Sequence, residues 1–132
     1  MPPHGDYDYI GEAVNLFNIL KVKKVIFNCG EFNTLESSLI KFLEAKKISY
    51  QSCINKLCID NYQLNFLNAK VFCDENNNSN VIYTDFNGYK FMFMEYAWIE
   101  QEKDILDKYN LANIEVLKVD IMGVRQVVVK SL

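Results

Sequence analysis

Two β-rich runs, residues 81–86 and 89–94, lie on either side of Asn87-Gly88. An Asn-Gly pair in this position supplies both positive-φ residues of a type I′ turn, whose twist matches that of the flanking strands. The sequence therefore predicts a β-hairpin over residues 81–94, and the turn sets its register. One face of this hairpin carries six residues, most of them aromatic or β-branched: Ile82, Thr84, Phe86, Tyr89, Phe91 and Phe93.

The second face of the hairpin is also largely apolar. Next to Asp85 and Lys90 at the turn end, it carries four apolar or aromatic residues: Val81, Tyr83, Met92 and Met94. An antiparallel sheet with one solvated face normally shows a polar residue at every second position. Because this hairpin does not, we expect it to be buried on both faces or to keep one face for a partner.

Three segments have apolar residues at helical spacing. The first helix is expected over about residues 9–20, with Asp8 as its N-cap. The second begins after Asn33, whose side chain caps it while Glu36 completes a capping box. The third is expected over residues 95–109.

The remaining apolar runs are short and rich in β-branched or aromatic residues, which is typical of strands. The expected strands outside the hairpin cover residues 24–29, 48–54, 56–60, 69–73, 114–119 and 124–129. Residues 62–67 fit a strand or a helix equally well. The polar, Asn-rich segment 74–80 predicts an exposed loop before the hairpin.

This order of elements predicts an α+β fold, with a mainly antiparallel sheet and about three helices packed on it. A chain of 132 residues, half of them hydrophobic, suits a single globular domain over residues 1–132, with residues 1–7 flexible. No apolar stretch is long enough for a membrane helix, and the N-terminus lacks the features of a signal peptide, so we expect a cytoplasmic protein. The four cysteines are then expected to be free thiols, with a disulfide or a metal site as alternatives.

The chain has a single histidine, His4, in its Pro-containing N-terminal segment. Unless His4 folds back, this excludes Ser/His/Asp, Cys/His and His-based zinc sites. The five glycines form no phosphate-binding loop, and a single arginine, Arg125, provides no set of bidentate side chains for nucleic acid. We therefore predict no cofactor, no metal site and no direct nucleic-acid partner.

The remaining enzymatic candidate is Cys29, which ends a predicted strand just before the capped second helix. The helix N-terminus would stabilise a thiolate there, with Glu31 alongside. The simpler interpretation is that Cys29 is a small buried residue next to the turn at Gly30.

Acidic residues are in excess in the C-terminal half, where residues 67–132 have ten acidic and seven basic side chains, against seven of each in residues 1–66. The spacing of Glu100, Asp104 and Asp107 puts three carboxylates on one face of the third helix. Such a face either steers a basic partner or is a solvated surface partly neutralised by neighbouring lysines. The predicted partner-binding residues are these acids, two neighbouring ones and two hairpin tyrosines: Glu95, Glu100, Glu102, Asp104, Asp107, Tyr83 and Tyr89.

These features favour a non-enzymatic protein-binding module. In particular, they suit a small acidic inhibitor or immunity-type protein that neutralises a basic partner such as a nuclease toxin. Two alternatives stay open: a small enzyme that uses Cys29 as a reactive thiol, and a structural subunit that self-associates through its hairpin or C-terminal strand.

Overall fold

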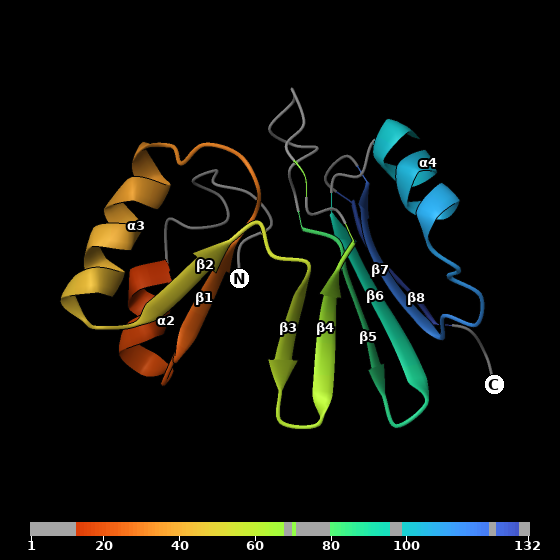
Figure 1. Ribbon diagram of the computed structural model, residues 1–132, viewed down its shortest axis with the longest axis horizontal. Coiled ribbons are helices and arrows are strands. Elements are labelled where there is room, and N and C mark those ends of the chain that lie inside the picture. The colour runs from red at the N-terminus through yellow and green to blue at the C-terminus, as the bar shows by residue number, and fades with distance from the viewer. Residues whose placement is uncertain (1–12, 68–69, 71–79, 96–98, 122–123, 130–132) are drawn as a thin grey trace.

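The computed structural model of the protein describes residues 13–67, 70, 80–95, 99–121 and 124–129, and these residues form two sheets (Figure 1). The N-terminal unit consists of α2 (Ala13–Ile19), β1 (Lys24–Phe27), α3 (Thr34–Ala45) and β2 (Ser49–Ser52). The large sheet has the order β3-β4-β5-β6-β7-β8, and α4 connects β6 to β7. Its elements are β3 (Lys56–Ile59), β4 (Tyr62–Phe66), β5 (Ile82–Phe86), β6 (Tyr89–Glu95), α4 (Ile99–Lys108), β7 (Val116–Ile121) and β8 (Val124–Val129).

The N-terminal unit is a parallel pair of strands joined through α3. The predicted capping box starts this helix, because Asn33 Oδ1 accepts from the Glu36 N–H at 2.9 Å and Glu36 Oε2 accepts from the Asn33 N–H at 2.9 Å. Leu39 and Leu43 of α3 pack against Phe27 of β1, and the rings of Phe17 and Phe42 stack between α2 and α3. These contacts bury one face of the strand pair.

The hairpin predicted around Asn87-Gly88 is confirmed. Asn87 has a φ of 53° and Gly88 a φ of 90°, as a type I′ turn requires. Asp85 Oδ1 also accepts from the Gly88 N–H at 2.7 Å, which closes the turn further. The strands pair in the predicted register from Phe86 opposite Tyr89 back to Ile82 opposite Phe93.

The large sheet is mixed. β3 to β6 form an antiparallel meander, whereas β6 and β7 are parallel and are therefore joined by a crossover through α4. Ile105 of this helix packs against Met92 and Met94 of β6, together with Val81 and Leu67. α4 thus covers one face of the sheet and lies at the right of the view in Figure 1.

The α+β fold is confirmed, and four of the five pairings in the large sheet are antiparallel. The described helices are divided between the two sheets: α2 and α3 pack on the N-terminal unit and α4 packs on the large sheet. The physical reason is that each sheet has its own hydrophobic core, one around Leu43 and one around Ile105.

Several element boundaries differ from the prediction. β6 continues to Glu95, and the third helix, α4, is described from Ile99 to Lys108. The ambiguous segment 62–67 forms β4, where it pairs with β3 and β5. The predicted flexible N-terminus, the start of the first helix, and nearly all of the strand and loop predicted over residues 69–80 lie outside the described residues.

Candidate protein interface

The face of the large sheet that points away from α4 carries a group of aromatic and apolar side chains. Strand register places Phe86 beside Tyr89 and Ile59 beside Tyr62, while the Tyr62 and Phe86 rings meet across β4 and β5. We define this aromatic face by six residues of β3 to β6: Ile59, Tyr62, Phe86, Tyr89, Phe91 and Phe93. All of them except half-buried Phe91 are between 39% and 55% exposed.

The rings of the aromatic face hold each other in place. Ring centroids are 4.9 Å apart for Tyr62 and Phe86, and 5.9 Å apart for the edge-on pair Phe86 and Phe91. Thr84 lies beneath them, fully buried, and donates its hydroxyl to the Gln63 carbonyl at 2.9 Å. The exposed rings therefore stand on a rigid, hydrogen-bonded sheet, which reduces the entropy lost when they pack against another surface.

α4 covers the opposite face of the sheet, so the apolar side chains on that face are buried, whereas those of the aromatic face are partly exposed. Met92 and Met94 point to the helix because residues in a strand alternate between the two faces. Phe91 and Phe93 then project to the other side. The sheet is thus a two-layer structure in which the hairpin buries one apolar face and leaves the second accessible.

Two acidic residues lie at the turn end of the large sheet. Asp60 lies in the turn between β3 and β4, where its φ is 51°, and Asp85 lies two residues before the hairpin turn. Both are exposed, but Asp85 is opposite Lys90 in the strand register and shares the α4 side of the hairpin with Tyr83. Lys118 of β7 lies beside Phe93 in the register, so the margin of the aromatic face is not purely negative.

The acidic residues predicted on the third helix do not form an unpaired carboxylate cluster. Asp104 Oδ2 is 2.9 Å from Lys108 Nζ and 3.0 Å from Lys70 Nζ. The hydrogen bonds from Lys108 and Lys70 hold the pKa of Asp104 below its usual value. Glu102 and Asp107 are exposed, whereas the side chains of Glu95 and Glu100 lie outside the part of the chain that is described.

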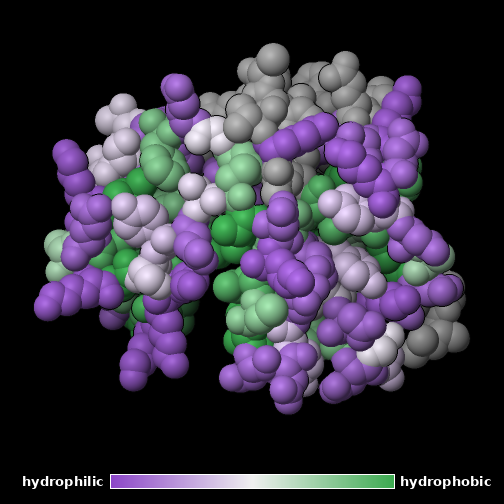
Figure 2. Space-filling model, viewed as in Figure 1, coloured by the Kyte–Doolittle hydropathy of each residue, from purple (hydrophilic) through white to green (hydrophobic). Residues whose placement is uncertain are grey.

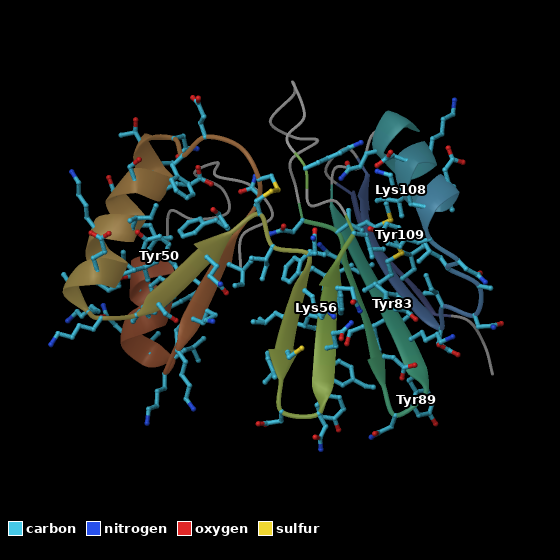
Figure 3. All side chains as sticks on the ribbon, in the orientation of Figure 1. Tyr50, Lys56, Tyr83, Tyr89, Lys108 and Tyr109 are labelled. Atoms are coloured by element: carbon cyan, nitrogen blue, oxygen red, sulfur yellow. A yellow bond between two sulfur atoms is a disulfide. The ribbon has the colours of Figure 1, made fainter. Side chains whose placement is uncertain are left out.

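The two predicted tyrosines lie on opposite faces of the sheet. Tyr89 belongs to the aromatic face and is 55% exposed, at the turn end of β6 (Figure 3). Tyr83 is half-buried on the α4 side, packs on the core around Ile105, and lines a cavity of about 530 Å³ together with Lys56 and Tyr109. The predicted site is therefore divided by the thickness of the sheet, with Tyr89 separate from the helix acids.

The expectation of free thiols is wrong for two of the cysteines. Cys29 at the end of β1 and Cys53 after β2 form a disulfide, with their Cα atoms 4.4 Å apart. Parallel pairing of β1 with β2 brings them together, since the Cys53 N–H donates to the Phe27 carbonyl at 3.2 Å. Cys29 therefore carries no thiolate in this structure, while Cys58 is free and exposed as a thiol and Cys73 lies outside the described residues.

The described residues hold neither a metal-binding cluster nor a membrane-spanning helix. No group of three or more His, Cys, Asp or Glu side chains there is arranged to hold a metal ion. No described helix is long and apolar enough to cross a membrane. A second cavity, of about 490 Å³, lies between α4 and the sheet and is lined mainly by apolar side chains.

Ile59 and Tyr62 are the residues of the aromatic face that the sequence pattern misses. The hairpin face of Phe86, Tyr89 and Phe93 follows from strand alternation alone. The signal for the other two residues is weaker, because it requires knowing that residues 62–67 form a strand beside β5. Comparison of the chain with protein families, with curated proteins and with solved structures finds no match.

Proposed function

We propose that this chain is a non-enzymatic protein-binding module of the inhibitor or immunity type, which docks a basic protein such as a nuclease toxin through its aromatic face. One observation carries the proposal. The chain has the apolar residues and a helix to cover one side of its large sheet, yet five partly exposed aromatic or aliphatic side chains stand together on the other side.

The chemistry of the aromatic face suits binding hot spots. Tyrosine and other aromatic residues bury a large area with few rotatable bonds, and they are enriched at the centres of protein interfaces. Tyr62 and Tyr89 add a hydroxyl at the edge of the apolar surface, where it remains available for hydrogen bonds. We expect Tyr89 and Phe93 to be the anchors, because they are exposed on the strand next to the sheet centre.

The net charge favours a basic partner over an acidic one. The whole chain has a formal net charge of −3. A partner with an excess of lysine and arginine would complement this charge.

The helix acids would act at longer range. α4 lies on the far side of the sheet from the aromatic face, so Glu102 and Asp107 would attract a basic partner through the electric field without touching it. Such steering raises the association rate and weakens when salt screens the charges.

The test starts with a partner captured by the tagged chain from its own source cells, followed by binding kinetics with the two purified proteins. The double variant Tyr89→Ser, Phe93→Ser removes the two anchors, and we expect it to dissociate at least tenfold faster than the wild type. Tyr109→Ser is the matched control, because Tyr109 is a similarly exposed aromatic residue near α4 on the other side. A partner that binds the double variant as tightly as the wild type contradicts the proposed surface.

A second variant tests whether the acidic residues of α4 attract the partner. Glu102→Lys, Asp107→Lys reverses two exposed charges without breaking the ion pairs of Asp104. We expect slower association at low salt and a smaller difference at high salt. An unchanged association rate at low salt would remove the helix from the proposal and leave the aromatic face as its support.

Self-association is the second candidate, and one observation favours it. β3 is an edge strand of the large sheet, and the surface is notched where the N-terminal unit meets β3 and β4, with hydrophobic side chains on the walls (Figure 2). An open edge beside an apolar face is a place for a second copy to pair. Sedimentation over a concentration series distinguishes the candidates. If the wild type is a dimer and the variant Tyr89→Ser, Phe93→Ser is a monomer, the partner of the aromatic face is a second copy of the chain and not a different protein.

A further inference from the structure

The cavity between α4 and the large sheet lies on the opposite side of the sheet from the aromatic face, and Glu102 is the residue that it shares with the function proposed above. It has a volume of about 490 Å³, within the range of small-molecule sites. Its floor is formed by Met92 and Met94 of β6 and Leu117 of β7, and its wall by Ile105 of α4. Apolar side chains therefore surround most of it.

The cavity arises from the way the chain returns to the sheet after α4. Ile105 is fully buried against the sheet, but Leu106, the next residue, is 67% exposed at the cavity wall. The connection to β7 also lines the cavity, through Leu111 and Asn113, and Asn113 has a φ of 68°. The space is bounded by unbranched methionine side chains, which adapt to ligands of different shape.

Two carboxylates lie among the lining residues. Glu102 comes from α4 and is exposed, and Glu115 comes from the segment just before β7. Glu115 Oε2 accepts from the Lys90 N–H at 2.7 Å, which fixes this side chain at the sheet. A carboxylate accepts several hydrogen bonds, so the one from Lys90 leaves capacity for a ligand. No lysine or arginine is among the described lining residues of this cavity.

We propose that this cavity binds a small amphiphilic amine. The alkyl or aryl tail lies among Met92, Met94 and Leu117, and the ammonium group interacts with Glu102 and Glu115. The argument is charge complementarity: an apolar cavity with two carboxylates and no cation in its lining favours a positive head group over a neutral one and disfavours a negative one. Burial of the tail supplies affinity, and the carboxylates supply selectivity.

The test uses three probes with the same tail and different head groups: n-octylamine, 1-octanol and octanoate. Binding to the full chain is measured by calorimetry at neutral pH and moderate salt. We expect octylamine to bind at least tenfold more tightly than octanol, and octanoate to bind more weakly than octanol. Equal affinity for the amine and the alcohol, or absence of binding by the amine, overturns the proposal.

Variants locate the binding. Glu102→Gln keeps the size of an exposed side chain and is expected to fold normally, and it should lower octylamine affinity severalfold while leaving octanol unchanged. Asp107→Asn is the control, because Asp107 is an exposed acid of the same helix that does not line the cavity. Leu111→Trp fills part of the space and should weaken octylamine and octanol alike. If Asp107→Asn weakens the amine as much as Glu102→Gln does, the amine responds to general surface charge and the site assignment is wrong.

Discussion

The two units of the chain bury the apolar faces of their strands to different extents. In the N-terminal unit, β1 has three of its four residues buried, α2 and α3 close one side, and a disulfide joins the strand ends. In the large sheet, α4 is the helix among the described residues that packs on one face, and the aromatic face on the other side remains partly exposed. The exposed apolar surface of the described residues is thus found on the large sheet, which is where we propose that a partner binds.

The two units also differ in the contacts that determine their structure. The N-terminal unit depends on contacts between residues distant in sequence, since β1 and β2 are parallel and separated by a helix. In the large sheet, the hairpins β3-β4 and β5-β6 depend on tight turns between neighbouring strands. The comparison predicts that substitutions in the N-terminal unit act through its core and its covalent link, and that those in the hairpin act through backbone geometry.

The largest effect is expected from Leu43→Ala in the N-terminal core. Leu43 has no exposed surface and packs with Phe27 and Leu39, so truncation leaves a cavity and costs about 2 to 5 kcal/mol of unfolding free energy. Leu35→Ala on the same helix is the control, because Leu35 is partly exposed and should cost much less. Urea titration of both variants measures the difference, and equal losses would contradict the assigned core.

Removal of the disulfide comes next. The bond closes a loop with a sequence separation of 24 residues, and a cross-link of this length stabilises a folded chain by about 3 kcal/mol, chiefly by restricting the unfolded state. We expect a reducing agent, or the double variant Cys29→Ala, Cys53→Ser, to lower the unfolding free energy by roughly 2 to 4 kcal/mol. Cys58→Ser serves as the control for thiol chemistry on the surface. Identical urea midpoints with and without reductant would show that the bond is absent or without effect.

The hairpin and the capped helix were predictable because their determinants are local. Asn87-Gly88 specifies its turn within four residues, and Asn33 with Glu36 specifies a helix start within the same distance. The Cys29–Cys53 bond was not predictable, because cysteine spacing does not reveal which strands are neighbours. The parallel pairing of β6 with β7 was missed for the same reason.

An intermediate effect is expected from Gly88→Val. A β-branched residue at a φ of 90° is strained whatever the space around it, and no atom lies within 4 Å of the position of an added Cβ, so the cost is one of backbone conformation. We expect a loss of about 1 to 3 kcal/mol. Gly88→Asn should cost clearly less, because asparagine tolerates positive φ better. If valine and asparagine are equally tolerated in a denaturant titration, turn strain does not control the hairpin.

The candidate site was predictable only in part. Alternation along the hairpin identifies Phe86, Tyr89 and Phe93 as one face, but the sequence does not say which face α4 covers. Nor does it show that Lys70, distant in sequence, pairs with Asp104. Helical periodicity predicts which carboxylates share one face of a helix. Whether lysines neutralise these carboxylates depends on residues that are distant in sequence.

The smallest effect is expected from Asp104→Asn, and it tests whether this carboxylate is structural. Lys108 and Lys70 lower the pKa of Asp104 in the folded protein, so the folded state binds fewer protons than the unfolded one between that pKa and the ordinary value of 3.8. The resulting stabilisation is present above the ordinary value and is lost as the pH falls through the folded pKa. We therefore expect the wild type to exceed Asp104→Asn by up to about 1 kcal/mol at pH 7, and the difference to shrink in strong acid. Paired urea titrations at the two pH values measure it. A difference that is the same at both would mean that the ion pairs with Lys108 and Lys70 do not stabilise the fold.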